Sequence, residues 1–476
     1  GFTASPRLKF SPSTPISHTR QSYAEQGNSV APPFSSLTDE ALIALGTIGE
    51  RAGSLFNPSV RLGVTGLSRA GKTIFITSLV HNLLHGGRLP MFEAAWSGRI
   101  SKAYLQPQPD DAVPRFQYED HIARLVQDRL WPDSTRAISE LRLVIEYESA
   151  SGWGQLFSGG KLNLDIVDYP GEWLLDLPLL AQDYRTFSRN AVELARSSAR
   201  SDLSGKWLAR ASQVNAHGEA SEETARELAA LFTEYLAACK ADSRALSTLP
   251  PGRFLMPGDL DGSPALTFAP LPDLDDSRAP SGSLQAMMER RFESYKSAVV
   301  KPFFREHVAR LDRQIVLIDA MQAMNAGRDA VIDLERALAE VLECFRPGRN
   351  NLISRLFTHR IDKVLVAATK ADHLHHESHD RLEALVSRLV DRAATRIGAS
   401  GADIEVIAMA AVRATREASD TSGDDNLPLI VGTPIKGEEI DGHIFDGETK
   451  TAIFPGDLPK NPESFFEQLE SGSKPP

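Results

Sequence analysis

The stretch "RLGVTGLSRAGKTIFITSLV", from Arg61 to Val80, places an apolar strand before a glycine-bearing loop and an apolar helix after it. Residues 66–73 match the pattern G-x-x-x-x-G-K-[ST] at every position. The glycines let the backbone curl so that N–H groups point at phosphate oxygens, and the helix adds its positive end. A chance glycine-rich turn is the alternative. The position between strand and helix favours a phosphate-binding loop.

Two side chains of this loop have specific expected roles. Lys72 is expected to bridge the β- and γ-phosphates, and Thr73 to offer its hydroxyl to Mg²⁺. The predicted phosphate-site residues are Gly66, Ser68, Arg69, Ala70, Gly71, Lys72, Thr73 and Ile74.

Six short apolar, β-rich runs alternate with segments of helical or turn character. They are residues 60–65, 141–147, 162–168, 314–319, 364–368 and 404–409. Strands that alternate with helices indicate a mainly parallel sheet covered on both faces. The second and third runs, joined by a Gly-rich link, are expected to pair antiparallel. The sequence therefore predicts an α/β fold, a P-loop NTPase of the Ras-like type with a mostly parallel six-stranded sheet.

A long segment interrupts this α/β core and is predicted to be mainly helical, with candidate helices near 177–199, 220–240 and 283–312. The predicted divisions are a flexible N-terminal arm (1–37), the first part of the nucleotide-binding domain (38–173), the helical insertion (174–312), the second part of that domain (313–420) and a C-terminal extension (421–476).

Composition limits the classes of function. The formal net charge of −11 argues against bulk electrostatic binding to DNA or RNA. Cys239 and Cys344 give neither a disulfide framework nor a CxxC pair, which is typical of a reducing compartment. No apolar run approaches the ~20 residues that cross a bilayer. We therefore expect a cytoplasmic protein that binds no nucleic acid.

Two strands end in an aspartate that could hold the metal. Asp168 begins "DYPG", and the D-x-x-G spacing lets its carboxylate face Mg²⁺ while the Gly171 N–H reaches the γ-phosphate. In ATPases whose catalytic Glu follows the strand aspartate, Asp319 would need Glu at the next position, which is Ala320. We therefore predict Asp168 as the metal residue. Asp319 is expected to end an ordinary core strand, with a polar role there as the alternative.

The base is predicted from residues 369–372, Thr-Lys-Ala-Asp, which match [N/T]-K-x-D after the apolar run 364–368. The Asp372 carboxylate can accept from both guanine N1–H and N2–H₂, a donor pair that adenine lacks. The Lys370 stem can cover the face of the base. Four matching residues are a weak signal alone. Because they follow a phosphate loop and D-x-x-G in that order, we predict that the base is guanine.

A second segment of the guanine site is expected at the end of the sixth run, "VIAMAAVRAT". Ala411 and Val412 stand where a backbone N–H would meet guanine O6, with Arg413 flanking the base. A core strand followed by a helix start would explain the same letters. The predicted base-site residues are Thr369, Lys370, Asp372, Ala411, Val412 and Arg413.

Two residues depart from the usual pattern of hydrolysing domains. Glu172 stands where glutamine usually orients the attacking water, so it either positions water weakly or points away and pairs with a cation. Arg69 either acts as an arginine finger in cis or points to solvent or to an acidic neighbour such as Glu172. The second reading of Arg69 is favoured, and slow turnover follows for either reading of Glu172. The predicted catalytic residues are Lys72, Arg69, Glu172 and Gly171.

A switch hydroxyl is also expected to bind Mg²⁺ when GTP is bound, from a position a few residues before the second strand. "WPDSTRAISE" offers Ser134, Thr135 and Ser139. Thr135 has the best placement, and we predict it as a metal ligand beside Thr73 and Asp168.

The ordered motifs resemble the translation-factor-like branch of P-loop GTPases. The segments "GLSRAGKT", "DYPGEW", "AATKADH" and "FPGDLP" resemble those of the YcjX family of bacterial stress-associated P-loop proteins, and the resemblance runs from about residue 40 onward. The resemblance implies a cytoplasmic GTP-binding and GTP-hydrolysing protein connected with phage-shock-type envelope stress, often paired with an integral membrane partner.

We therefore expect a Mg²⁺-dependent GTPase that acts as a slow nucleotide-controlled switch on a protein partner. A nucleotide-binding regulator with negligible hydrolysis is one alternative, and an ATPase is another.

Overall fold

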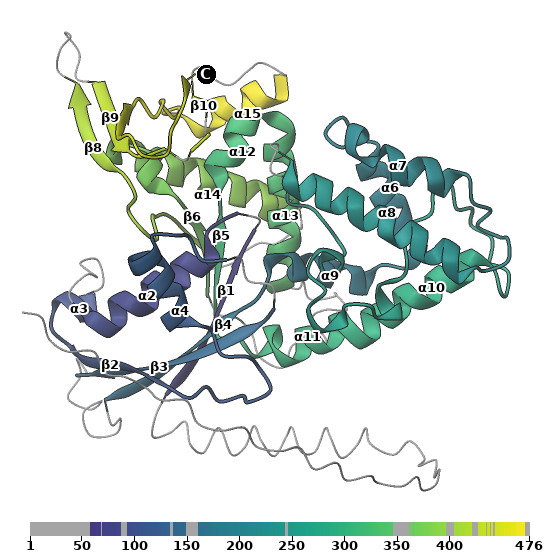
Figure 1. The fold of residues 1–476 in the computed structure, drawn as a ribbon, viewed down its shortest axis with the longest axis horizontal. Coiled ribbons are helices and arrows are strands. Elements are labelled where there is room, and N and C mark those ends of the chain that lie inside the picture. Colours follow the sequence, from purple (N-terminus) through teal and green to yellow (C-terminus); the bar gives the residue numbers. More distant parts are fainter. Residues whose placement is uncertain are drawn as a thin grey trace, which may run out of the picture. The chain divides into compact units, whose positions relative to one another are not determined.

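Seven strands form one mixed sheet in the computed structural model, in the order β2-β3-β4-β1-β5-β6-β7 (Figure 1). The bounds are β1 (Ser59–Gly66), β2 (Ile100–Gln106), β3 (Ser139–Tyr147), β4 (Lys161–Asp168), β5 (Arg313–Ile318), β6 (Lys363–Ala368) and β7 (Ile404–Ala408). β1, β4, β5, β6 and β7 pair in parallel, and β3 pairs antiparallel with both β2 and β4. The predicted α/β class and the predicted antiparallel pair are confirmed.

The structure describes residues 58–67, 69–86, 93–133, 137–148, 160–242, 246–345, 361, 363–396, 404–420, 427–434, 436–437, 439–440 and 443–471. The predicted N-terminal arm, as well as Ser68, Ser134 and Thr135, lie outside these residues.

The sheet has one strand more than the six predicted, because residues 100–106 form β2 at its edge. The sequence "ISKAYLQ" has no continuous apolar run, and its residues are exposed or half-buried. An edge strand with one solvent-exposed face needs fewer apolar residues than a central strand. The apolar-run criterion therefore missed it.

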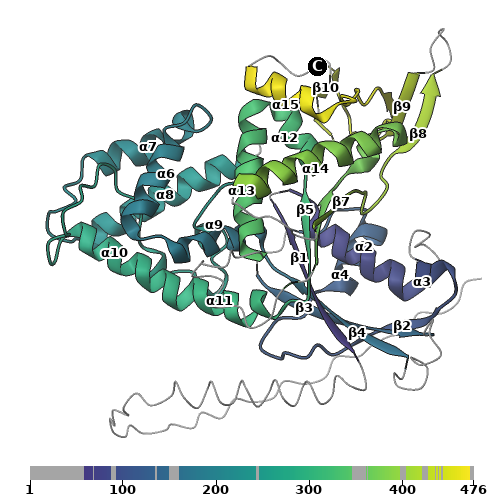
Figure 2. The ribbon, with the colours of Figure 1, turned by 180° about the vertical axis from the view of Figure 1, so that it is seen from behind.

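Helices cover both faces of this sheet (Figures 1 and 2). Those of the α/β part are α2 (Lys72–His85), α3 (Glu93–Trp96), α4 (Tyr118–Ala123), α12 (Ala320–Ala326), α13 (Arg328–Phe345) and α14 (His379–Arg396), with a short π-helix, η1 (Arg124–Asp128), and two short 3₁₀ helices, η8 (Ala371–His373) and η9 (His376–Ser378).

Successive residues of the central strands point to opposite faces. Leu317 of β5 packs with α2, whereas its neighbours Val316 and Ile318 join a larger apolar cluster with α13 and α14. That cluster continues into the helical insertion through residues such as Trp207 and Phe292. The insertion and one face of the sheet therefore share a single apolar core.

The insertion contains several helices rather than the three expected. Its elements are η2 (Gly171–Ala181), α6 (Tyr184–Ala195), α7 (Ser201–Ser212), α8 (Glu222–Ala241), α9 (Gly252–Leu255), η3 (Gly258–Leu260), η4 (Pro264–Leu266), α10 (Leu284–Tyr295), η5 (Lys296–Val300), α11 (Lys301–Glu306) and η6 (Val308–Arg310).

The helix predicted over 177–199 is divided, because the 3₁₀ segment η2 contains Pro178 and Asp183 starts a new helix. The Asp183 side chain accepts from the N–H of Thr186 at 2.8 Å, which is an N-cap. Ser221 and Ser283 cap α8 and α10 in the same way. α7 was not predicted. Polar caps thus set the starts of these helices.

The C-terminal part adds a three-stranded sheet in the order β12-β9-β8, a two-residue pair of strands and a final helix. These are β8 (Arg416–Asp420), β9 (Leu427–Gly432), β10 (Glu439–Ile440), β11 (His443–Ile444), β12 (Thr451–Ile453) and α15 (Pro462–Ser471). Because β8 pairs with β9, this sheet begins before the boundary expected at residue 421.

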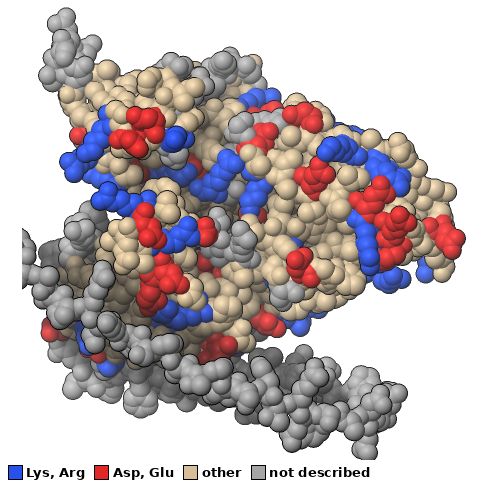
Figure 3. Space-filling model, viewed as in Figure 1, with Lys and Arg blue, Asp and Glu red and all other residues tan. Residues whose placement is uncertain are grey.

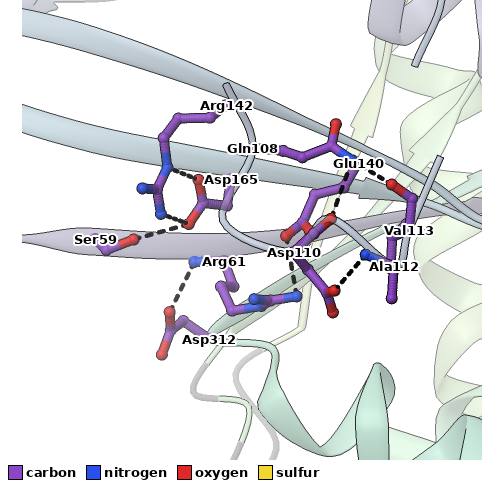
Figure 4. A network of polar contacts seen from close by, with 10 residues as sticks. All are labelled: Ser59, Arg61, Gln108, Asp110, Ala112, Val113, Glu140, Arg142, Asp165 and Asp312. Carbon is purple, nitrogen blue, oxygen red and sulfur yellow. Dashed lines mark hydrogen bonds and ion pairs between the residues drawn. The ribbon is translucent and has the colours of Figure 1, made fainter. Parts of the chain in front are cut away.

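A polar network joins β1, β3 and β4 away from the phosphate loop (Figure 4). Arg142 donates two hydrogen bonds to Asp165, at 2.6 and 2.7 Å, and Ser59 donates to the same carboxylate. Arg61 lies 3.0 Å from Glu140, whose pKa is raised by burial. These contacts tie the strands that carry the site to one another.

The surface carries mixed charges. Figure 3 shows Lys and Arg side chains interspersed with Asp and Glu side chains on the visible face. Exposed ion pairs such as Lys206–Glu234, at 2.7 Å, join α7 to α8, and pairs of this kind contribute little to stability. Among the described helices, none has the length and apolar character that a bilayer span requires.

Candidate nucleotide site

The phosphate-binding motif lies at the carboxyl end of β1, which pairs with β4 on one side and β5 on the other. This is the place where open α/β sheets bind ligands. Arg69 and Gly71 adopt left-handed backbone conformations, with φ of 64° and 76°. Gly71 is the N-cap of α2, and no side chain of this residue caps the helix. The N-terminal end of a helix favours an anion such as a phosphate.

Lys72 and Asp168 are in direct contact beside this loop. The Nζ of Lys72 bonds to Oδ1 of Asp168, and the Asp168 side chain is buried. The register explains the meeting, because Asp168 pairs with Val64 of β1, two residues before the loop begins. The structure thus brings together the predicted phosphate-binding lysine and the predicted metal carboxylate.

Gly171 of the D-x-x-G motif packs directly against the phosphate loop. A Cβ added to Gly171 would lie 2.1 Å from the carbonyl oxygen of Gly66 and 3.2 Å from the Thr65 hydroxyl. Since the nearest atom belongs to the backbone, a side chain at 171 would require the chain to move. The glycine is therefore needed for the close approach of residue 171 to the phosphate loop.

The donors expected for Mg²⁺ fit a hard cation. Thr73 is buried at the start of α2, and its hydroxyl bonds to the Asp133 carbonyl at 3.5 Å. Carboxylate, hydroxyl and carbonyl oxygens are the ligands that Mg²⁺ prefers. Asp168, held by the neighbouring Lys72, provides the carboxylate. Thr135, the third predicted ligand, lies outside the described residues.

The residues predicted to bind the base follow the ends of β6 and β7. Asp372 is 6% exposed, its Oδ2 accepts from the N–H of Ala414 at 2.8 Å, and its carbonyl accepts from the Thr415 hydroxyl. The N–H and hydroxyl of Thr369 donate to the Ile318 carbonyl. Two predicted segments, 369–372 and the turn after β7, therefore meet through the Asp372 side chain.

The residues of that turn are mostly exposed. Val412 is 38% exposed, and Arg413 pairs with Glu417 at 3.4 Å on the surface. Ala411 is half-buried. The Ala371 N–H donates to the Met409 carbonyl, which fixes the turn to the Asp372 segment.

Asp319 has a polar role, which was the less favoured alternative. Its side chain caps α12 by accepting from the Gln322 N–H at 3.1 Å, and its other oxygen lies 2.5 Å from Nζ of Lys370. Lys370 has a left-handed backbone, with φ of 61°. Asp319 thus anchors the lysine of the base motif, a pairing of two strand ends that no local sequence pattern indicates.

Glu172 and Arg69 contact the insertion rather than each other. Oε1 of Glu172 lies 2.6 Å from Nζ of Lys240, and Nη2 of Arg69 donates to the Ala241 carbonyl at 3.2 Å. The predicted pairing of Glu172 with a cation is present, and the cation is Lys240. Lys240 and Ala241 end α8, and the amphipathic pattern of that helix gives no sign that they reach the site.

Other elements of the insertion contact η2, the segment that begins at the glycine of D-x-x-G. Asp176 accepts from the Gly252 N–H at 2.7 Å and from the Tyr295 hydroxyl at 2.5 Å. The guanidinium of Arg253 lies 3.3 Å from the centre of the Trp173 ring. Several elements of the insertion therefore contact this one segment.

The fold and these residues define a P-loop nucleotide-binding protein with the Ras-like α/β fold. The chain belongs to the YcjX-like family, DUF463, whose profile matches residues 60–473. It is 38% identical over 411 residues to the Ras-like GTPase YcjX of Escherichia coli strain K12, which covers 84% of this chain and 86% of that protein. The Ras-like GTPase YcjX of Shewanella oneidensis is 32% identical over 434 residues, covering 86% of this chain and 89% of that protein.

Proposed function

We propose that this protein binds GTP with Mg²⁺ and hydrolyses it to GDP and phosphate, as a slow switch that acts on a protein partner. The main support is that the Lys72–Asp168 contact and the Asp372 site both lie at the carboxyl ends of parallel strands of one sheet. Two relatives that align over most of this chain carry the name Ras-like GTPase.

The choice of guanine rests on Asp372. Its buried carboxylate, held by Ala414, accepts from the paired donors N1–H and N2–H₂ of guanine. The stem of Lys370, anchored by Asp319, covers the base. Ala411 and Val412 supply the N–H for guanine O6, and Arg413 flanks the base.

Thr73 and Asp168, together with Thr135, would hold Mg²⁺. The ion neutralises phosphate charge when it is bound. Lys72 then turns from Asp168 to the β- and γ-phosphates. Its ammonium group thus pairs with the Asp168 carboxylate before the nucleotide binds and with the phosphates afterwards. The backbone N–H groups of the loop from Gly66 to Ile74 surround the same oxygens.

Hydrolysis proceeds by in-line attack of water on the γ-phosphorus. The water oxygen bonds to the γ-phosphorus while the bond to the β–γ bridging oxygen breaks, GDP leaves with that electron pair, and a proton of the water passes to an oxygen of the released phosphate. Lys72, the loop N–H groups and the Gly171 N–H stabilise the negative charge of the transition state. Glu172 orients the water. Arg69 is assigned no direct part, because its guanidinium is engaged by Ala241.

Loss of the γ-phosphate releases Gly171 and the segment around Thr135. Because Gly252, Arg253 and Tyr295 contact the residues that follow Gly171, we propose that the helical insertion receives this change. Family resemblance supports a cytoplasmic role in envelope stress and a partner in the membrane. Nucleotide-dependent binding to that partner is the corresponding test.

A binding-only regulator is the second candidate, because Glu172 is engaged by Lys240. Release of phosphate from GTP separates the two functions, with Lys72→Ala as the blank. Mg²⁺-dependent release above that blank supports the GTPase. Tight GTP binding with release equal to the blank supports the regulator. Faster release from ATP than from GTP supports an ATPase.

A further inference from the structure

The carboxyl end of α8 contacts both the residue that follows D-x-x-G and the phosphate loop. Lys240 pairs with Glu172, which follows D-x-x-G, and the next residue, Ala241, accepts a hydrogen bond from Arg69 of the phosphate loop. Two adjacent residues of the insertion thus meet the two places where this chain departs from the usual GTPase pattern. The insertion completes the surroundings of the proposed reaction centre.

The Lys240–Glu172 pair lies close to the phosphate loop. Glu172 adjoins Gly171, whose backbone packs on Gly66. The Glu172 side chain is 10% exposed and that of Lys240 is 25% exposed, so water and salt screen this pair less than a surface pair. The Gly252 backbone also packs against the Glu172 carbonyl, which limits the positions that Glu172 can take.

This pair offsets the unfavourable negative charge that a glutamate at position 172 would place near the γ-phosphate. A carboxylate beside a γ-phosphate adds a like charge, which disfavours the bound nucleotide and the attacking water geometry. An ammonium group 2.6 Å from the carboxylate offsets that charge. A carboxylate has about four lone-pair directions, and one lysine contact leaves others for a water molecule.

We propose that Lys240 is a positioning residue for hydrolysis, supplied in cis by the helical insertion. It offsets the charge of Glu172 and holds the carboxylate where it accepts a hydrogen bond from the attacking water. The inference rests on the proposed GTPase function. It makes the seating of α8 a requirement for turnover, so that a partner that shifts the insertion changes the rate.

A merely structural ion pair would tether η2 to α8 without affecting the chemical step. The two roles differ in how the rate responds to changes at both residues, because a positioning lysine acts only through the charge on Glu172. The test therefore uses the parent chain, Lys240→Gln, Glu172→Gln and the double variant. Lys240→Arg tests rescue by a second cation, and Lys206→Gln removes a similar pair at the exposed α7–α8 surface as the control.

Single-turnover phosphate release at saturating GTP and Mg²⁺, together with the Kd for a fluorescent GTP analogue, gives the two readouts. We expect Lys240→Gln to slow turnover ~10- to 100-fold, with a change in Kd of less than about twofold. In the Glu172→Gln background the same change should alter the rate by less than about twofold. Lys240→Arg should recover most of the rate, and Lys206→Gln should match the parent.

The inference is overturned if Lys240→Gln turns over at the parent rate, or if the effects of the two changes multiply. It is also overturned if the loss of rate accompanies an equal loss of GTP affinity. In these cases the parent still hydrolyses GTP, and the proposed function stands. If the parent releases no more phosphate than Lys72→Ala, both the function and the role of Lys240 are wrong.

Discussion

The carboxylate of Asp319, at the end of β5, lies 2.5 Å from the Nζ of Lys370, in the base motif at the end of β6. The two strands pair in parallel, and Ile318 pairs with Ala368, so the residues that follow them come side by side. Asp319 also caps α12. One side chain therefore starts a helix and anchors the lysine that is expected to cover the base.

Two changes at Asp319 separate these roles. Asp319→Asn keeps a side-chain oxygen for the cap but removes the charge, and we expect GTP affinity to fall by ~2- to 5-fold with little change in Tm, because the Lys370 side chain is 38% exposed. Asp319→Ala should lose the same affinity and about 1 kcal/mol of stability as well. Titration with a fluorescent GTP analogue and thermal melting measure both. Equal melting of the two variants would rule out the capping role.

The contact between Gly171 and Gly66 predicts that Gly171→Ala damages the site. The new Cβ would meet a backbone oxygen at 2.1 Å, so we expect stability to fall by about 2 kcal/mol or more, together with a large loss of turnover. Gly205, inside α7, has open space around its Cβ position, and Gly205→Ala is the matched control. It should gain about 0.5–1 kcal/mol. A Gly171→Ala protein as stable and active as the parent would contradict the close approach.

Asp176 predicts a pH dependence of stability. Burial raises the pKa of its carboxyl to about 7, and the hydrogen bonds from Tyr295 and Gly252 only partly oppose this. The folded chain holds the proton more tightly than the unfolded chain, so the contribution is fully present below the unfolded pKa and is lost as pH rises through about 7. Between pH 6 and pH 8 we expect a loss of about 1.4 kcal/mol.

Asp176→Asn cannot titrate, while its amide oxygen still accepts from Gly252. The denaturant midpoint of the parent chain should therefore fall from pH 6 to pH 8 by more than that of Asp176→Asn. Parallel pH profiles for the two proteins would exclude Asp176 as the titrating group.

The Arg69→Ala variant tests whether the guanidinium of Arg69 acts in cis on the phosphates. Its hydrogen bond to the Ala241 carbonyl engages it with the insertion. We expect Arg69→Ala to change turnover by less than about tenfold, whereas loss of an arginine finger costs ~10³- to 10⁵-fold. Single-turnover rates with GTP decide between these values. A drop of a thousandfold with unchanged affinity would mean that Arg69 leaves Ala241 to reach the phosphates.

The parts of the fold with strong local signals were predicted from the sequence. The phosphate loop follows from the G-x-x-x-x-G-K-T motif after a strand, and the antiparallel pair β3–β4 follows from two apolar runs joined by a Gly-rich link. The contact of Lys72 with Asp168 was not predicted; it arises because the sheet places the ends of β1 and β4 side by side. β2 was missed because an edge strand with a wet face lacks a continuous apolar run. The first helix expected in the insertion is divided because Pro178 lies in η2 and Asp183 caps a new helix. The prediction of one continuous helix gave more weight to the apolar pattern than to these two residues.

Contacts between distant segments were not predictable in the same way. Lys240 stands in the last turn of α8, where a basic residue also suits the helix dipole, so its sequence position does not indicate a catalytic neighbour. Asp319 was expected to end an ordinary core strand, because the next residue is Ala320 rather than Glu. Its partner Lys370 follows a different strand, β6, so the pairing has no local sequence signal. Both pairings depend on how helices and strands pack, which a single sequence does not encode in any short motif.

Guanine recognition by Asp372 can be tested with a single variant. Asp372→Asn replaces the carboxylate, which accepts from two guanine donors, by an amide that suits the carbonyl at C2 of xanthine. Binding of fluorescent GTP and xanthosine triphosphate analogues to the parent and the variant is the measurement. We predict a loss of GTP affinity of at least about 100-fold and a gain of xanthosine triphosphate binding. Unchanged GTP binding by Asp372→Asn would contradict it.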